Sequence, residues 1–377
     1  MGFISLGKID KKCIPILIGC IIAFLSRLLF RVKETKLFEQ KSLPNLIATI
    51  AKLFSFIPYI IFKRQSKKVH NNDIQNRNSN GVELIYFDRT IEQTGDKWKY
   101  ILLSAILIFV QGIILLYTYN IKSNTWIWDI LITSFLYYFM LKVKLFKHHY
   151  LSMGIIILTG LIIDLASENL QEDIINNPLF LFLRVLREIL FSLNDVISKY
   201  VMEKKFCSIY ELMFYTGFLD FFFFGSYTLL SYYYFKVDNF EEYFNNFNII
   251  ELLVVLGVMI TQFGLFLFTL IINKNNTPCH LFIMYVFAQF AYYLDFSIKS
   301  IIFIFCYIFI LFWSLIFNEI IELNFWGLSD NTKKNIMLRV EIEENAVNTN
   351  STMNTMPTFS DIDDIRRTTI ELGNREN

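Results

Sequence analysis

Ten apolar stretches follow one another along this chain of 377 residues, and each meets or nearly meets the length needed to cross a lipid bilayer. An α-helix rises about 1.5 Å per residue, so roughly 17 to 25 residues cover a hydrocarbon core of about 30 Å. Lipid offers no partners to backbone N–H and C=O groups, so such segments have to be helical. The predicted spans are 13–30, 45–62, 100–119, 125–141, 150–166, 179–201, 211–234, 249–272, 281–296 and 301–319.

The composition argues against several classes of protein. Apolar residues make up 54% of the chain and charged residues 18%, against roughly 25% charged in an average soluble domain. The 35 basic and 34 acidic residues nearly balance, so nothing suggests the concentrated basic face that a nucleic-acid partner requires. The four histidines do not predict a metal box, and a solvated pair is the simpler interpretation of His148 and His149 in a basic turn. We therefore expect no enzymatic activity, no metal and no cofactor.

The charges of the connecting loops predict the orientation of the chain. Basic residues concentrate in the connections 63–99, 142–149 and 202–210, whereas 168–173 and 238–242, on the opposite side, are acidic. Cytoplasmic loops are enriched in Lys and Arg, so we expect both termini to face the cytosol, from the plasma membrane or an endomembrane. The basic connection 31–41 falls on the other side and does not follow this rule.

Counting the spans predicts two halves. Five spans precede the acidic connection 168–173 and five follow it, and because five is odd the second half is inverted relative to the first. Such inverted repeats place a substrate site near the middle of the membrane, between the halves. The predicted parts are a cytosolic N-terminus over 1–12, a first half over 13–166 with a cytosolic loop over 64–98, a second half over 167–322, and a largely disordered cytosolic tail over 323–377.

Proline positions support several of the predicted helix starts. Pro44, Pro178 and Pro278 precede or open the second, sixth and ninth spans, where the missing N–H of proline costs nothing. Pro58 lies deeper in the second span, and we expect a kink there.

The sixth span carries an unusual stripe of charge. Arg184, Glu188, Asp195 and Lys199 follow one another at spacings of four, seven and four, which places them within roughly 60° of one another around a helix. An ionisable residue at bilayer depth costs at least about 2.5–3.5 kcal/mol, so this face should meet protein or water rather than lipid. It either lines an aqueous cavity that attracts a polar or anionic solute, or forms i,i+4 ion pairs (Arg184 with Glu188, Asp195 with Lys199) that fasten helices.

Other polar residues within the spans extend this candidate site. Asp220 in the seventh span could pair with a cation of the sixth, and Gln111 and Gln262 could line the cavity or bridge helices. Asp129 lies near a predicted helix end, where interfacial solvation explains it. The candidate substrate-binding residues are Arg184, Arg187, Glu188, Asn194, Asp195, Lys199, Asp220, Gln111 and Gln262.

Two segments carry a resemblance to a known family. The first reads SLNDVISKYVMEKK over 192–205 and continues as FCSIYE over 206–211. The second reads FNEIIELN over 317–324 and leads into GLS over 327–329 and NTKKNI over 331–336. The first resembles the drug/metabolite transporter superfamily, in its EamA-type and nucleotide-sugar-transporter-like branches. The second resembles the end of the last span in related ten-span proteins of single-celled eukaryotes.

The resemblance implies a five-plus-five inverted repeat around a central cavity, working by alternating access without ATP. The glycine-rich nucleotide-recognition patch of some sugar-nucleotide carriers is not evident, so the resemblance does not extend to a nucleotide-sugar substrate. No ATP-binding P-loop occurs in the sequence either, which argues against a primary pump.

The sequence thus predicts an all-α polytopic membrane protein. We expect a secondary transporter or exchanger of a small polar or anionic metabolite, whose partners are that metabolite, the lipid bilayer and a second copy of the chain in a homodimer. The alternative is a non-transporting membrane scaffold or complex subunit whose polar residues only fasten helices together.

Overall fold

The computed structural model describes residues 4–6, 13–29, 42–65, 97–118, 125–167, 173, 175–235, 240–245, 248–293, 298–323, 332 and 335. Most of the predicted N-terminal segment 1–12, loop 64–98 and tail 323–377 lie outside these residues. The chain divides into two units, Leu6–Ile321 and a smaller one formed by Met1–Ser5 with Glu322–Asn377. A two-stranded sheet pairs β1 (Ile4–Leu6) with β2 (Ile321–Leu323). The helices below belong to the larger unit.

A helix overlaps each of the ten predicted ranges. These helices are α1 (Ile14–Leu29), α2 (Leu43–Leu53), α5 (Lys97–Tyr117), α6 (Asp129–Leu141), α7 (Lys147–Ala166), α9 (Pro178–Lys204), α10 (Ile209–Leu230), α12 (Ile249–Asn275), α13 (Leu281–Gln289) and α14 (Ile298–Phe317). Shorter helical segments adjoin them: η3 (Thr125–Trp128), η4 (Ser231–Phe235), α11 (Phe240–Asn245), η5 (Pro278–His280) and η6 (Phe290–Tyr293).

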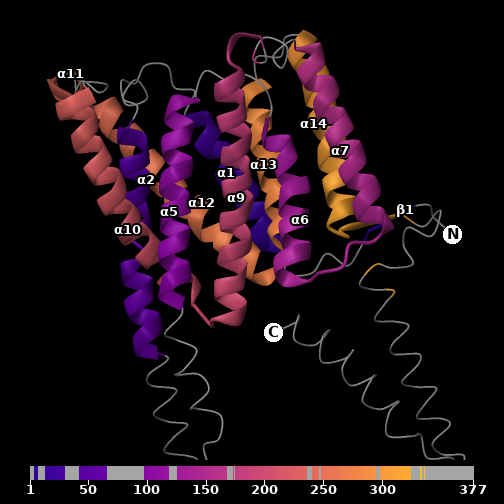
Figure 1. Cartoon of the computed structure of the whole chain (residues 1–377), viewed down its shortest axis with the longest axis horizontal. Coiled ribbons are helices and arrows are strands. Elements are labelled where there is room, and N and C mark those ends of the chain that lie inside the picture. Colours follow the sequence, from indigo (N-terminus) through magenta and orange to yellow (C-terminus); the bar gives the residue numbers. More distant parts are fainter. Residues whose placement is uncertain are drawn as a thin grey trace, which may run out of the picture. The chain divides into compact units, whose positions relative to one another are not determined.

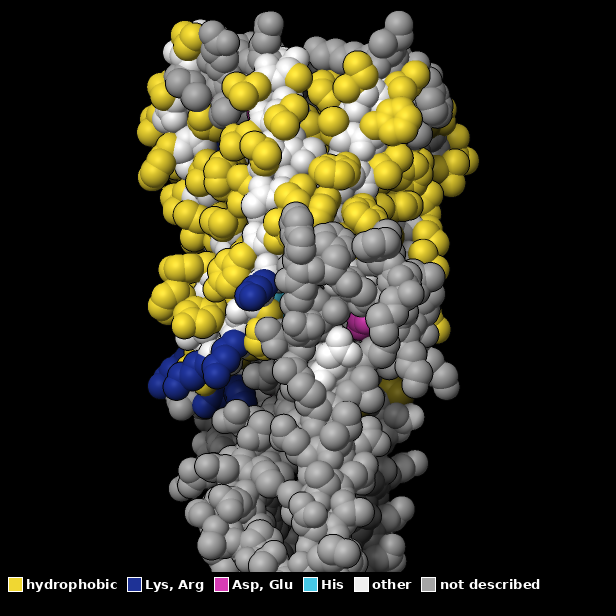
Figure 2. All heavy atoms as spheres, turned by 90° about the vertical axis from the view of Figure 1, so that its right-hand side faces the viewer, with side chains coloured by type: hydrophobic (Ala, Val, Ile, Leu, Met, Phe, Trp, Pro, Cys, Tyr) yellow, Lys and Arg dark blue, Asp and Glu magenta, His cyan; other side chains and the backbone are white. Residues whose placement is uncertain are grey.

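Several of these helices have the dimensions and composition of membrane spans. Within the part of the chain that the structure describes, five segments are long and apolar enough to cross a membrane: Leu43–Gln65, Lys97–Tyr117, Lys147–Ala166, Ile249–Asn275 and Ser300–Phe317. Large apolar side chains on their outer faces are exposed, for example Leu158 at 60% and Ile260 at 72%. Figure 2 shows a broad hydrophobic surface on one side of the molecule, with Lys and Arg gathered toward one end. Such a surface suits lipid rather than water, and the chain is an all-α membrane protein.

Local sequence explains where several helices begin. Pro44 and Pro178 occupy the first turns of α2 and α9, where no intrahelical N–H bond is lost. The Ser208 hydroxyl accepts the Glu211 N–H at 3.1 Å at the start of α10. The Asn248 side chain accepts the Glu251 N–H at 2.9 Å at the start of α12.

The second span is interrupted where its proline predicts it. Helix α2 ends at Leu53, a turn follows at Phe54 and Ser55, and helical structure resumes up to Gln65. Pro58 cannot donate to the carbonyl four residues before it, and its ring crowds that position. The Ser55 N–H and hydroxyl both bond to the Lys52 carbonyl, at 3.0 and 2.6 Å. The α-helix is therefore interrupted immediately beside Lys52.

The helices of the two predicted halves interleave. Helix α9 packs against α5 and α6, α1 packs against α12 and α13, and α2 packs against α10 and α12 (Figure 1). Helix α7 pairs with α14. Side-chain contacts show the relative direction of α5 and α9. Tyr100 contacts Tyr200 and Gln111 contacts Leu190, so the two helices run antiparallel.

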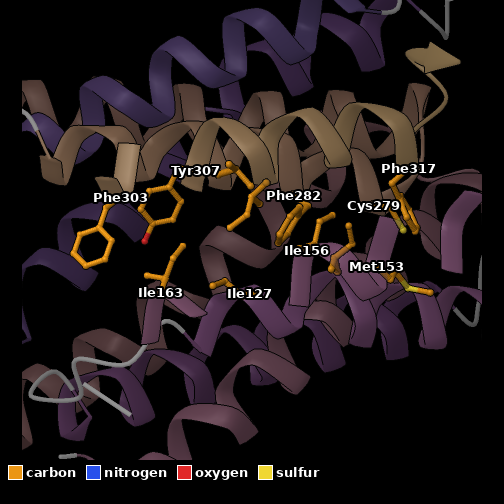
Figure 3. Close-up of a cluster of buried hydrophobic side chains, with 12 residues drawn as sticks. Ile127, Met153, Ile156, Ile163, Cys279, Phe282, Phe303, Tyr307 and Phe317 are labelled. Atoms are coloured by element: carbon orange, nitrogen blue, oxygen red, sulfur yellow. The ribbon is translucent and has the colours of Figure 1, made fainter. Parts of the chain in front are cut away.

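The largest apolar core among the described residues joins η3, α6, α7, η5, α13 and α14. Figure 3 shows side chains from α7, α13 and α14, including Ile156, Phe282 and Tyr307, projecting into this cluster. All three are at most 1% exposed. Because lipid is as apolar as these residues, close packing rather than burial from water holds such helices together.

Candidate functional site

Helix α9 turns its polar stripe inward, toward neighbouring helices. Glu188, Ser192, Asp195 and Lys199 are each at most 4% exposed. Their spacings of four, three and four place them on one face of the helix, which is the face inferred from the sequence. Arg184 and Arg187 remain about one-fifth exposed at the beginning of this face.

Three carboxyl groups lie near one another along this face. The Ser192 hydroxyl donates to Asp129 Oδ1 at 2.5 Å, and the Thr133 hydroxyl donates to the same oxygen at 3.1 Å. Asp129 is close enough to both Glu188 and Asp195 for electrostatic interaction. Asp129 is only 4% exposed, so the expectation that it is solvated at an interface was wrong. The 3-10 helix η3 immediately precedes it.

Asp195 contacts helices of the second half. The Tyr285 hydroxyl of α13 lies 3.5 Å from Asp195 Oδ2, and the Asn273 amide of α12 donates to the Asp195 carbonyl at 2.6 Å. Tyr285 and Asn273 were not among the predicted residues. A tyrosine in an apolar span gives no signal of its own, because its partner is decided by packing.

Two arginines of α9 converge on Glu188. Arg187 Nη1 donates to Glu188 Oε1 at 2.6 Å, and Arg184 Nε lies 3.8 Å from the same oxygen. The predicted i,i+4 pair between Arg184 and Glu188 is therefore present, although it is long. The Nε atoms of Arg184 and Arg187 are buried and have no hydrogen-bond partner among the described residues.

A third arginine reaches the same region from α1. Arg27 interacts electrostatically with Arg184, and its Nη1 donates to the Tyr292 hydroxyl at 3.0 Å. The Phe191 ring lies 5.9 Å from the Arg187 guanidinium. Two guanidinium groups thus contact Glu188 and a third interacts with Arg184, and the Nε donors that Arg184 and Arg187 leave unbonded suit an anionic group.

The alternative interpretation of the sequence predicted an ion pair between Asp195 and Lys199. Lys199 instead bonds to other groups. Its ammonium group donates to the Lys274 and Asn276 carbonyls at 3.0 and 2.6 Å, and it forms an ion pair with Glu203 at 2.7 Å. The carbonyls at the end of α12 lack intrahelical partners and carry the negative end of the helix dipole. Lys199 therefore caps α12.

His280 lies close to this cap. Its Nδ1 lies 3.3 Å from the Thr277 N–H, which donates to it. Burial, with a smaller contribution from the Lys199 charge, lowers the pKa of His280 to about 4. The ring is therefore neutral at neutral pH and adds no charge beside the ammonium group of Lys199.

Asp220 pairs with a different helix from the one expected. Its Oδ2 lies 2.7 Å from Lys52 Nζ of α2, and both side chains are at most 3% exposed. The Lys52 ammonium also lies 4.2 Å from the centroid of the Phe266 ring. Sequence reasoning missed Lys52, although the signal was available: lone opposite charges in two apolar spans are best stabilised by each other.

The uncharged candidates bridge helices. The Gln111 amide donates to the Leu190 carbonyl at 2.9 Å, and the Ser104 hydroxyl donates to the Asn194 side chain at 2.6 Å, so both join α5 to α9. The Gln262 amide donates to the Ser26 hydroxyl at 3.0 Å and joins α12 to α1. The nine candidate residues thus separate into a cluster around Glu188 and several individual helix contacts.

His148 and His149 are not the solvated pair that the sequence suggested. The His148 side chain is only 4% exposed and lies 3.2 Å from Glu319, beyond the end of α14. Among the described residues there is one group of three His, Cys, Asp or Glu side chains close enough together to hold a metal ion. It consists of His148, His149 and Glu319.

The chain matches no protein-family model and no curated protein.

Proposed function

We propose that this protein is a secondary transporter or exchanger of a small anionic metabolite, and that Glu188 and the arginines beside it, at the beginning of the α9 stripe, form its solute site. The observation that supports this proposal is the pair Arg184 and Arg187 at Glu188, whose two buried Nε donors have no hydrogen-bond partners among the described residues. An anion placed there would gain charge-assisted hydrogen bonds that the protein alone does not form.

The packing of the helices supports ten spans arranged as a five-plus-five inverted repeat. Under that repeat α1 corresponds to α9, α2 to α10, α5 to α12, α6 to α13 and α7 to α14. If the halves are related in this way, the contacts of α1 with α12 and α13 should have equivalents between α9 and helices α5 and α6. All four contacts occur. The α2–α12 contact likewise has its equivalent in α10–α5. The α2–α10 and α7–α14 contacts each join two equivalent helices. A twofold relation between the halves accounts for these pairs.

This arrangement supports transport by alternating access. Helix α9 of the second half lies against α5 and α6 of the first, so rocking of one half against the other would change the surroundings of its polar face. The resemblance to the drug/metabolite transporter superfamily, in its EamA-type and nucleotide-sugar-transporter-like branches, agrees with this mechanism. The basic connections place both termini in the cytosol in this proposal.

The alternative function is a membrane scaffold or complex subunit. It is favoured by the number of candidate residues already bonded to another helix, since Gln111, Asn194, Gln262 and Lys199 all are. Under this interpretation the polar groups fasten helices, and the arginines stabilise only Glu188.

Uptake into proteoliposomes separates the two functions. We expect saturable uptake of one member of a panel of labelled phosphate and carboxylate metabolites. Removing a charge-assisted hydrogen bond costs about 1.5–3 kcal/mol, so Arg184→Gln and Arg187→Gln should each reduce uptake at low solute concentration by about ten- to a hundredfold. Lys63→Gln, which removes a cation from an exposed side chain near the end of the helical segment Leu43–Gln65, is the matched control and should transport normally.

Two results would contradict the proposed site or function. Real uptake that survives in both folded arginine variants would show that the solute binds elsewhere. Absence of uptake across the panel, together with stoichiometric co-purification of a partner protein, would favour the scaffold.

A further inference from the structure

One end of the α7–α14 pair gathers three metal-ligating side chains that the proposed transport site does not use. His148 and His149 lie in the first turn of α7, and Glu319 follows the last turn of α14. Because the beginning of one helix meets the end of the other, the two helices are antiparallel. One ligand atom from each residue lies within 4.8 Å of the others.

His148 is buried without being satisfied. Neither ring nitrogen has a hydrogen-bond partner among the described residues, although the side chain is only 4% exposed. His148 Nε2 lies 3.2 Å from Glu319 Oε1, but the relative orientation of the two groups does not meet hydrogen-bond geometry. A buried polar group left unbonded costs about 1–3 kcal/mol, so this arrangement calls for a further partner.

Glu319 occupies a backbone position that favours glycine. The chain closes α14 with hydrogen bonds from the Glu319 N–H to the Ile316 carbonyl and from the Ile320 N–H to the Leu315 carbonyl. The second of these is the long bond of a Schellman motif, whose left-handed residue is usually glycine. Glu319 adopts that conformation with φ 58°, which is unfavourable for a residue with a side chain. A glutamate at this position suggests that its carboxylate is required there.

We propose that His148, His149 and Glu319 bind a divalent transition-metal ion of the zinc class. Two imidazole nitrogens and one carboxylate oxygen are ligands that Zn²⁺ accepts, with water in a fourth position. Tetrahedral ligands at about 2.1 Å from zinc are separated from one another by about 3.4 Å. The 3.2 Å between His148 Nε2 and Glu319 Oε1 already matches such an edge.

His149 completes the set after a local change. Its Nδ1 now accepts the Phe146 N–H at 3.1 Å, and its ring lies edge-on against Phe317, with centroids 4.8 Å apart. Coordination through Nδ1 displaces that hydrogen bond, and coordination through Nε2 moves the ring proton to Nδ1, which then no longer accepts it. His148 and Glu319 are therefore the primary donors and His149 the third.

A bound ion would hold the beginning of α7 against the end of α14. A ligand that binds only the folded state stabilises it in proportion to the logarithm of its concentration over its Kd. The prediction is independent of transport, because both helix ends belong to the fold whether or not a solute moves.

The test uses the full-length protein in detergent, stripped of metal with a chelator and then titrated with ZnCl₂ in a calorimeter. We expect one equivalent to bind per chain and the thermal midpoint to rise with added zinc. Bound Co²⁺ should give the intense visible absorption of a four-coordinate site. His148→Ala should weaken zinc binding by at least about tenfold.

Glu319→Gly is the decisive variant, because glycine favours the left-handed conformation and the protein should still fold. Its zinc affinity should fall by at least about tenfold. Lys142→Gly is the matched control: Lys142 is also a left-handed residue at a helix end, with φ 56°, and lies outside the cluster. It should retain full zinc binding.

Absence of saturable binding in the wild-type protein would overturn the proposal. So would unchanged affinity in folded Glu319→Gly, because the ion would then bind elsewhere in the chain.

Discussion

Lys52 of α2 and Asp220 of α10 form an ion pair of 2.7 Å between two side chains that are at most 3% exposed. The centroid of the Phe266 ring lies 4.2 Å from the Lys52 ammonium group, so the ring also contacts the cation. Asp220 Oδ1 has no hydrogen-bond partner among the described residues. The pair is therefore enclosed by protein and is sensitive to the loss of either charge.

Removing one charge of this pair should destabilise the protein more than removing both. Breaking a buried pair leaves an uncompensated charge and costs about 3–5 kcal/mol, whereas apolar replacement of both partners is often nearly neutral. We expect Asp220→Leu and Lys52→Met each to lower the thermal unfolding midpoint strongly, and the double variant to recover most of the loss. Additive losses in the double variant would show that the two residues do not interact.

The same contact depends on a glycine. A Cβ at Gly217 would lie 2.5 Å from the Lys52 Cβ and 3.3 Å from its carbonyl carbon, so α2 and α10 approach too closely there for a side chain. Gly217→Ala should cost about 1–3 kcal/mol through overpacking. Gly225→Ala in the same helix is the control, since nothing lies within 4 Å of its added Cβ, and it should be neutral or slightly stabilising. Equal midpoints for the two variants would refute the close approach.

The Ser192 hydroxyl joins α9 to α6 through Asp129, so its removal should weaken the packing of these helices. We expect Ser192→Ala to cost about 1–2 kcal/mol in unfolding free energy. Ser314 is the matched control, because it is equally buried and, among the described residues, its hydroxyl bonds to the Ile310 carbonyl of its own helix at 2.7 Å and not to another helix. Ser314→Ala should change stability little; a loss as large as that of Ser192→Ala would contradict the special role of the interhelical bond.

Lys199 offers a separate test of its role, because capping predicts loss of stability without loss of solute recognition. Lys199→Met removes two bonds to the end of α12 and should lower the unfolding free energy by about 2–3 kcal/mol. Uptake per folded molecule should be unchanged. Lys204→Met, an exposed position of the same helix, should affect neither quantity. A stable Lys199→Met protein that fails to transport would return Lys199 to the solute site.

The candidate site could be predicted only in part. The spacing of charges in α9 identified the buried face that carries Glu188, Asp195 and Lys199, because helix periodicity alone fixes which residues share a face. The partners could not be predicted, since Asp129 joins Ser192 across 63 positions and Lys199 joins Asn276 across 77. Spacing along one helix gives no information about which other helix faces it.

The sequence by itself determined that this is an all-α membrane protein, where its helices lie, and that Pro58 interrupts one of them. These properties follow from apolar length, backbone hydrogen bonding in lipid and proline geometry, all of which are local. Only the tertiary structure decided that Lys52 neutralises Asp220, 168 positions away, that Lys199 caps α12, and that His148 is buried beside Glu319. Which opposite charge satisfies a buried group depends on how whole helices pack, and that is a property of the assembled chain.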